Sequence, residues 1–374
     1  MPLLTLSVQM SKQSLPLELE TLLRLTKPKI DELSYETILK QITSSFNWTY
    51  FLERAIATNL AGYLLPYPEI GRQYFPPIVY DHIRGYQRKI QLHSSFLREA
   101  ILEFVPQLDQ AKIPYALLKG WDLHFRFGIS LKERQISDID LLIDAKDLNQ
   151  VQAFFEQLGY TTTRYVYKSK WHERYQKQHT PLQAQKGQIY FDVHVCLFTE
   201  DEPYQININS LLLNRTLIDN HQVFVLEKKA AAVHFYLQLF KDLYYGPHFK
   251  PSLLIENHFY SYLNGIDELA SSWNALKEIK TIQRFIEQVD LYQDNTEFTN
   301  QFYAYLSGNA LPYPTRVKQK IRNTIRRTTP NWLRIPLFWK SIFPDYSYLI
   351  YYFGQNSYLI LWSKRFFKLL TKVA

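Results

Sequence analysis

The sequence predicts an α+β protein in which a small mixed sheet is flanked by N- and C-terminal helical regions. Alternation of apolar and polar residues, the pattern of strands, is concentrated in residues 111–200. Helical spacing of apolar residues dominates residues 1–110 and 201–310. Residues 311–374 are basic and aromatic, with further helical spacing. We therefore expect four regions, with the α/β core as the second.

Composition indicates a folded protein of the cytoplasm. Hydrophobic residues make up 46% and charged residues 21% of the 374, which excludes a disordered chain. Cys196 is the only cysteine, so no disulfide forms within the chain, and a reducing compartment is expected. The most apolar stretch, residues 342–362, is interrupted by Pro344 and Gly354, so no transmembrane segment is predicted.

The N-terminal region is expected to support the core. Apolar residues follow helical spacing from Leu17 to Leu25 and from Trp48 to Tyr63. A long helix is predicted from Ile78 to about Val105, with Pro77 near its start and Pro106 at its end. No cluster of chemically reactive residues lies in these helices.

The core opens with a short buried strand, Tyr115–Leu118, that breaks at Gly120 into a helix. A glycine at such a turn lets backbone N–H groups approach a phosphate at the helix N-terminus. Lys119 could add a positive charge at the same place. The turn is therefore a candidate phosphate-binding site.

Two carboxylates lie on one face of the next predicted strand. Alternation from Arg134 to Ile143 places Asp138 and Asp140 on the same side. Carboxylates so close repel each other, and Mg²⁺ or Mn²⁺, which prefer oxygen ligands, would remove that repulsion. The alternative is that both aspartates lie on the solvated face of an edge strand.

A third acid follows on a later strand. Asp144 is expected to cap a helix that runs to Leu158, and Gly159 lies just past its end. Residues 187–196 alternate again, which places Asp192 and His194 on the polar face. Between these elements, residues 168–179 mix basic and aromatic side chains, which suit a phosphate or a stacked base, or a solvated hairpin loop.

These motifs together resemble the uncharacterised nucleotidyltransferase family, a branch of the polymerase-beta-like nucleotidyltransferase superfamily. The resemblance is carried by Leu118-Lys119-Gly120, by Arg134 and the Asp138-Ile-Asp140 run, and by Asp192-Val-His194, and it is strong over about residues 113–196. It implies a nucleotidyltransferase core with Asp138 and Asp140 as metal ligands and Asp192 as the third ligand or the base. One feature departs from the superfamily, which usually has Gly-Ser or Gly-Gly where this chain has Gly120-Trp121.

The resemblance implies an enzyme that moves a nucleoside monophosphate from an NTP such as ATP to an acceptor hydroxyl and releases pyrophosphate. Mg²⁺ or Mn²⁺ would be the cofactor, and the acceptor could be a small molecule, a protein or RNA. Lys119 and Gly120 would hold the phosphates. Arg134 could contact the same phosphates in a bidentate manner, or form a salt bridge to Glu133 or Asp138.

The C-terminal half offers fewer chemical signals. His234, in a predicted helix from Glu227 to about Tyr245, could be a base or a hydrogen-bonded core residue. The net charge of +8 is concentrated in the tail, where residues 315–374 contain twelve Lys and Arg and one acid. Its densest part, residues 316–327, could bind an anionic partner, or be a solvated helix face.

Two other function classes fit parts of the pattern. A sugar transferase can also hold a metal with a D-x-D motif, but it would need a strand-rich nucleotide-binding half before that motif. A catalytically degenerate nucleotidyltransferase fold could act as a binding protein through its basic C-terminal region. The Gly120-Trp121 turn keeps this second alternative open.

Overall fold

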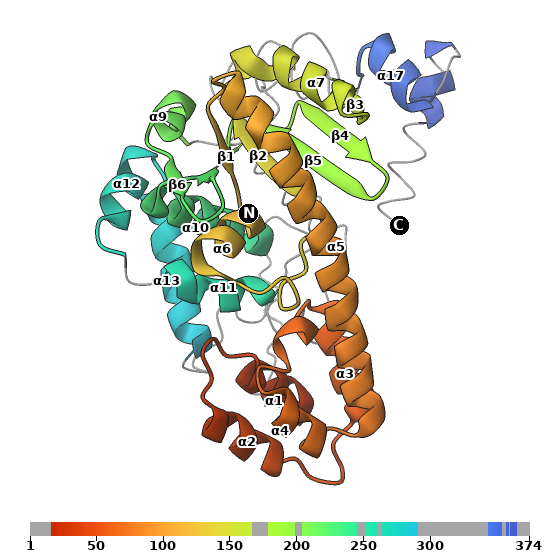
Figure 1. Ribbon diagram of the computed structural model, residues 1–374, viewed down its shortest axis with the longest axis vertical. Helices are drawn as coiled ribbons and strands as arrows, with labels where there is room; N and C mark the ends of the chain where they lie inside the picture. The colour runs from red at the N-terminus through yellow and green to blue at the C-terminus, as the bar shows by residue number, and fades with distance from the viewer. Residues whose placement is uncertain are drawn as a thin grey trace, which may run out of the picture.

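The computed structural model describes residues 16–166, 179–198, 204–244, 251–260, 263–290, 343–353, 357–358 and 360–364. Within these residues a mixed sheet of seven strands is surrounded by helices, which confirms the predicted α+β class (Figure 1). No helix in this part of the chain is long and apolar enough to cross a membrane. Most of the basic and aromatic segment 168–179 and all of the basic segment 316–327 lie outside the described residues.

The described part of the N-terminal region, residues 16–110, is helical and contains no strand. Its helices are α1 (Leu17–Leu25), α2 (Glu32–Lys40), α3 (Trp48–Ala57), α4 (Pro68–Tyr74) and α5 (Pro77–Gln110), with a 3-10 turn at Ala61–Tyr63. The side chains of Asp31 and Asn47 cap α2 and α3 by accepting backbone N–H groups. These helices pack around the first half of α5, at the end of the molecule away from the sheet (Figure 1).

Helix α5 is longer than the sequence predicts. Pro77 occupies the first turn as expected, but the helix continues through Pro106 to Gln110. Proline removes one backbone hydrogen bond and is costly inside a helix. Val105 and Leu108, on either side of Pro106, are buried in the core, and this packing offsets the cost. The predicted end at Pro106 is therefore wrong.

The sheet has the strand order β3-β4-β5-β2-β1-β7-β6. The strands are β1 (Tyr115–Leu117), β2 (Ile139–Ile143), β3 (Thr161–Arg164), β4 (Leu182–Lys186), β5 (Ile189–His194), β6 (Thr216–Ile218) and β7 (Val223–Val225). The pairs β2–β5 and β1–β7 are parallel, and the other neighbours are antiparallel. The strand that carries Asp140 therefore lies at the centre of the sheet, not at its edge.

The two faces of the sheet pack against different helices. Ile139, Leu141 and Ile143 of β2 face the core that holds α5 and α7 (Leu148–Gln157). In that core Phe104 of α5 stacks on Phe155 of α7, with ring centroids 3.9 Å apart. The opposite face carries Asp140 and Leu142, as the alternation predicts, and Leu142 belongs to the core that contains α10 (Lys228–Tyr244).

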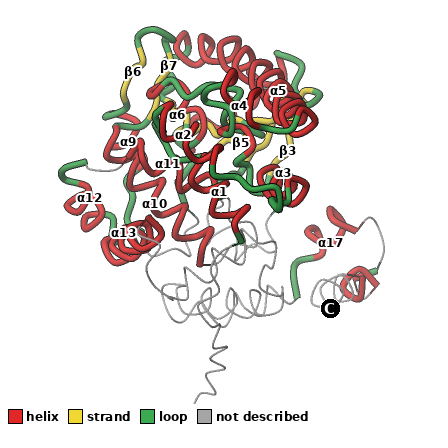
Figure 2. Tube along the Cα trace, turned by 90° about the horizontal axis from the view of Figure 1, so that it is seen from below, coloured by secondary structure: helices red, strands yellow, loops and turns green. Residues whose placement is uncertain are grey.

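The remaining helices are α6 (Gly120–Phe127), α9 (Ile208–Leu213), α11 (Ser252–Tyr260), α12 (Ile266–Ser272), α13 (Leu276–Asp290) and α17 (Tyr346–Phe353). Residues of α9, α11, α12 and α13, with Leu123 of α6, belong to this second core. Figures 1 and 2 both place α10, α12 and α13 together, on the side of the molecule away from α5. Asp144 begins the segment before α7, where its side chain accepts the N–H of Lys146, and Gly159 with φ +80° follows α7.

The N-terminal helices touch the loop before β2 at one tight point. A Cβ atom at Gly62 would overlap the backbone carbonyl of Glu133. The carbonyl of Gly62 also accepts a hydrogen bond of 2.9 Å from the side-chain amide of Gln87 on α5. This contact fixes the position of the loop that leads into Asp138 and Asp140.

We expect the substitution Gly62→Ala to lower the free energy of unfolding by about 1–3 kcal/mol, the usual cost of overpacking. Gly85→Ala is the matched control, because Gly85 is exposed on α5 and an added Cβ meets nothing within 4 Å. That control should gain about 0.5–1 kcal/mol from better helix propensity. Urea denaturation of both variants tests this, and equal stabilities would show that the contact is unimportant.

Candidate active site

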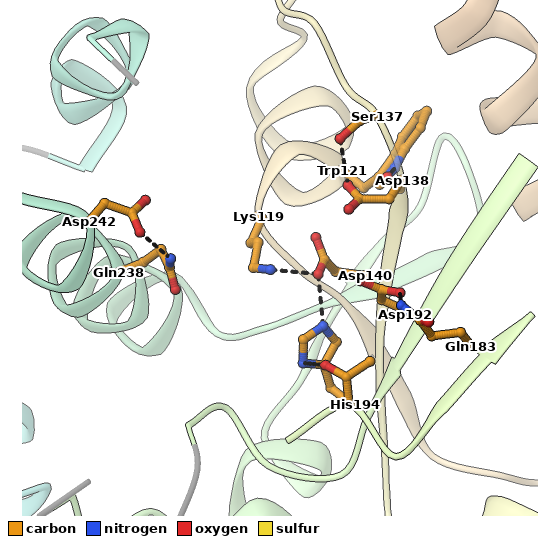
Figure 3. Close-up of polar contacts among 11 residues, drawn as sticks. Lys119, Trp121, Ser137, Asp138, Asp140, Gln183, Asp192, His194, Gln238 and Asp242 are labelled. Carbon is orange, nitrogen blue, oxygen red and sulfur yellow. Dashed lines mark hydrogen bonds and ion pairs between the residues drawn. The ribbon is translucent and has the colours of Figure 1, made fainter. Parts of the chain in front are cut away.

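The two strands that carry aspartates lie side by side. In the parallel pair β2–β5, Asp140 is directly opposite Asp192, and His194 is opposite Leu142. Asp138 stands just before β2, where its carboxylate accepts a hydrogen bond of 3.2 Å from the hydroxyl of Ser137. Figure 3 shows Asp138 and Asp140 on one side of the strand, with Asp192 beside Asp140. The strand register therefore places Asp192 next to Asp140.

The carboxylate of Asp140 is the best-held group in the site. One of its oxygens, Oδ1, accepts hydrogen bonds from Lys119 Nζ at 2.6 Å and from His194 Nε2 at 2.7 Å. Asp140 is 4% exposed, so this charge is buried among its partners (Figure 3). His194 Nδ1 lies 3.4 Å from the hydroxyl of Thr180, which leaves Nε2 as the nitrogen aimed at the carboxylate.

Lys119, not Gly120, has the glycine-like backbone at the turn. Its φ of +52° and ψ of −117° belong to a region that costs a residue with a Cβ about 1–3 kcal/mol. The backbone N–H of Leu118 bonds to the carbonyl of Asp140 at 3.0 Å, and the N–H of Leu123 to the carbonyl of Lys119 at 3.2 Å. These bonds fix the turn between β1 and α6, and the ammonium lies against Asp140.

Gly120 leaves room for the side chain of Arg134, a role that the neighbouring sequence did not indicate. A Cβ atom there would overlap Nη1 of Arg134 and lie 3.0 Å from its Cζ. The guanidinium is held in that place by Glu256 of α11, with Nε–Oε1 at 2.8 Å and Nη2–Oε2 at 3.1 Å. Arg134 is thus paired with a residue 122 positions away, and not with Glu133 or Asp138.

Trp121 follows the turn glycine and contacts the backbone of the D-x-D segment. Its ring is fully buried, and its indole Nε1 donates a hydrogen bond of 2.9 Å to the backbone carbonyl of Asp138. Trp121 therefore helps to fix the position of the D-x-D segment by a hydrogen bond to its backbone.

Burial and the neighbouring charges shift the pKa values of Asp138 and Asp140 in opposite directions. Burial raises the pKa of Asp138, and the carboxylates of Asp140 and Asp192 raise it further. Burial would also raise the pKa of Asp140, but Lys119 and His194 outweigh it and hold that pKa far below its usual range. The pKa of Lys119 is raised, because its contact with Asp140 outweighs the effect of burial.

The donor set suits a cation bound partly by substrate. Within the described residues, no three His, Cys, Asp or Glu side chains come close enough to hold one metal ion among themselves. Oδ1 of Asp192 accepts a hydrogen bond of 2.8 Å from Gln183, so its place as a third ligand remains a prediction. Mg²⁺ is commonly held by one or two carboxylates together with substrate phosphates, and Asp138 and Asp140 fit that pattern.

A cavity of about 180 Å³ opens beside these groups. One wall carries Lys119, Asp138 and Asp140, and the opposite wall is α10, whose His234, Gln238 and Asp242 also line the cavity. Figure 3 shows Gln238 and Asp242 across from Lys119, where the Gln238 amide donates to Asp242 at 2.9 Å. His234, Gln238 and Asp242 are spaced four residues apart, so they lie on one face of the helix. Gln238 and Asp242 were not predicted from the sequence, although this spacing from His234 could have indicated them.

His234 lies on this wall as a buried neutral ring. It is 3% exposed and packs edge-on against Phe198. Burial, with a smaller effect of Lys119, lowers its pKa to about 3. Burial likewise lowers the pKa of His179 to about 3, and the rings of His179 and His194 are 5.4 Å apart. His234 is therefore neutral at ordinary pH and can contribute hydrogen bonds to the cavity, not positive charge.

One comparison with known proteins shows the family. A family model described as "Uncharacterised nucleotidyltransferase" matches residues 44–277. The solution structure of the antibiotic-resistance factor ANT(2'')-Ia is 14% identical and covers 53% of this chain and 95% of its own, with a TM-score of 0.31. That score is too low to place residues of one structure on the other. A search of curated proteins found no match.

Replacement of Glu256 by glutamine should destabilise the protein by about 3–5 kcal/mol, because it leaves the buried guanidinium of Arg134 without a counter-charge. Asp267→Asn is the control, since Asp267 pairs with Lys280 at 2.5 Å where both side chains are about half exposed. That control should change stability by less than about 0.5 kcal/mol. Calorimetric melting measures both, and a similar small loss in each would contradict the assigned role of the buried pair.

The buried ring of His234 should make the protein sensitive to acid. The unfolded chain protonates this histidine near pH 6.5, whereas the folded chain does so near pH 3, so acid between these values favours unfolding. The loss from this residue is about 1.4 kcal/mol per pH unit below pH 6.5.

The variant His234→Gln should lose less stability than the wild type when the pH is lowered from 7.5 to 5. Chemical denaturation at both pH values measures the difference. The variant His93→Gln, at a partly exposed position of α5, serves as the control and should follow the wild type. An unchanged pH dependence in His234→Gln would contradict the neutral, buried state of the ring.

Proposed function

Because this chain belongs to the uncharacterised nucleotidyltransferase family, we propose that it transfers a nucleoside monophosphate from an NTP to an acceptor hydroxyl. The observation that carries the proposal is the meeting of Asp138, Asp140 and Lys119 at one wall of a cavity. Buried carboxylates with perturbed pKa values in a cavity are typical of catalytic sites.

The binding roles follow from the groups that reach the cavity. Asp138 and Asp140 would hold Mg²⁺ or Mn²⁺, and Asp192 lies opposite Asp140 on the neighbouring strand. The ion, when bound, would neutralise negative charge on the triphosphate. Lys119, whose side chain is 35% exposed, can also contact a phosphate oxygen from its place beside Asp140.

Gly120 and Arg134 shape the phosphate end of the cavity. The glycine allows Arg134 to lie directly against the turn, and Glu256 keeps the guanidinium there. The cavity is smaller than the roughly 300–1,000 Å³ of sites that enclose a whole small molecule. It therefore suits the triphosphate end of a nucleotide, with the base outside it.

The transfer itself forms one bond and breaks another. The acceptor oxygen bonds to the α-phosphorus, the bond from that phosphorus to the bridging oxygen of the β-phosphate breaks, and pyrophosphate leaves with the bonding electrons. The acceptor hydroxyl must lose its proton. Asp192 is the proposed proton acceptor, because Gln183 binds its Oδ1 and, among the described residues, no hydrogen bond reaches Oδ2.

The structure weakens one alternative function. A D-x-D sugar transferase would need a strand-rich nucleotide-binding half before the motif. Residues 16–110 contain helices and no strand, and only β1 lies between them and β2. The degenerate binding protein, which would act through residues 316–327, becomes one outcome of the experiment below.

The variant Asp138→Asn should lower transfer by about 10²- to 10³-fold, the loss typical of removing one preorganised electrostatic group. Asp138 is the better target than Asp140, because loss of the Asp140 charge would also leave Lys119 without its buried partner. NTPs labelled at the α-phosphate are incubated with the protein, Mg²⁺ or Mn²⁺ and a cell extract, and the labelled product is measured.

Asp81→Asn, at an exposed position of α5, is the matched control and should keep full transfer. Equal labelling by Asp138→Asn and the wild type would refute the assigned site. Absence of both labelling and nucleotide binding in the wild type would favour the degenerate binding protein.

A further inference from the structure

A lysine already occupies one cation position in the carboxylate site. Its ammonium nitrogen lies 2.6 Å from Oδ1 of Asp140, the same oxygen that receives Nε2 of His194 at 2.7 Å. Figure 3 shows both donors converging on that single oxygen. Among the described residues, no hydrogen bond reaches Oδ2 of Asp140, so one oxygen of this carboxylate remains available to a metal ion.

This geometry conflicts with a site for two metal ions. Two ions that act together lie about 3.5–4 Å apart and share ligands between them. A carboxylate commonly bridges two ions with one oxygen on each, and for that arrangement Asp140 would need both of its oxygens. Oδ1 is filled by two donors, and a second divalent ion there would have to displace the ammonium of Lys119.

The backbone conformation of Lys119 supports the position of its ammonium group beside Asp140. A glycine would adopt φ +52° and ψ −117° without strain, whereas a lysine does so at a cost. The strained conformation is fixed by the hydrogen bonds from Leu118 to Asp140 and from Leu123 to Lys119. The fixed turn brings the side chain back over β2, and not outward from the helix.

We propose that Lys119 is a resident cation that replaces the second metal ion, so that the site binds one divalent ion for each nucleotide. The inference rests on the proposed function and specifies how the site balances the charge of a triphosphate. In this arrangement Asp138 and Oδ2 of Asp140 would bind the metal ion, and Oδ1 of Asp140 accepts the hydrogen bond from Lys119.

Counting bound Mn²⁺ tests the proposal without measuring activity. The full-length protein is saturated with a non-hydrolysable NTP analogue and titrated with Mn²⁺, and the free ion is followed by electron paramagnetic resonance. The wild type should bind one Mn²⁺ per chain. Lys119→Met, which keeps the length of the side chain and removes its charge, should bind two.

Two further variants separate charge from backbone strain and from general loss of a lysine. Lys119→Gly removes the charge and relieves the strained turn, and it should also bind two Mn²⁺. Lys146→Met removes an exposed lysine outside the cavity, with a side chain 70% exposed, and should bind one. If a Lys119 variant melts too early to be titrated, its melting temperature with and without Mg²⁺ replaces the count, and a larger rise than in the wild type is expected.

Two outcomes would overturn the proposal: two Mn²⁺ in the wild type, or a single Mn²⁺ of unchanged affinity in both Lys119 variants. Both leave the proposed nucleotidyltransferase function intact, because nucleotide and metal still bind. Failure of the wild type to bind the analogue or Mn²⁺ would instead refute the proposed function, and the resident cation with it.

Discussion

A buried carboxylate must be balanced by charge or hydrogen bonds, and the carboxylate of Asp140 imposes that requirement on the centre of this molecule. β2 is the middle strand of the sheet, and Asp140 is only 4% exposed, so little water reaches the charge. Lys119 and His194 supply the balance from two neighbouring strand ends. The strained turn at Lys119 follows from this requirement, because it directs the ammonium towards β2.

The buried ion pair between Arg134 and Glu256 fixes the loop that precedes Asp138 and Asp140. Arg134 lies between the turn glycine and Glu256 of α11, and both of its ionic contacts come from the same carboxylate. Beside it, Asp122 of α6 pairs with Arg126 at 2.8 Å and accepts the hydroxyl of Tyr260 at 2.5 Å. Helix α11 is therefore connected to both sides of the turn, and a shift of α11 would move Lys119 and Asp138 together.

Local patterns were enough to predict much of this site. Alternation along β2 and β5 correctly placed Asp140 and Asp192 on one face, since a strand has a period of two residues. The glycine, the helix after it and the helix capped near Asp144 also followed from neighbouring residues. Such features depend on a few consecutive positions, and the sequence displays them directly.

Pairings across the chain could not be predicted in the same way. Nothing near Arg134 indicates that Glu256 will meet it, because the two are brought together by the packing of α11 on the second core. The positive φ of Lys119 was hidden for the same reason, since glycine and asparagine are the residues that usually signal it. Helix α5 continued through Pro106 because burial outweighed the local preference.

The cavity also argues against treating the α/β region as a complete unit. Its lining includes Lys119 and Asp140 from residues 111–200, and His234, Gln238 and Glu256 from residues 201–310. The match to the family spans residues 44–277, which takes in both walls and the helix that carries Gly62 against the loop before β2. A fragment limited to residues 111–200 would expose the carboxylates and lose the counter-charge of Arg134. The cavity is therefore lined by residues from the second and third predicted regions together.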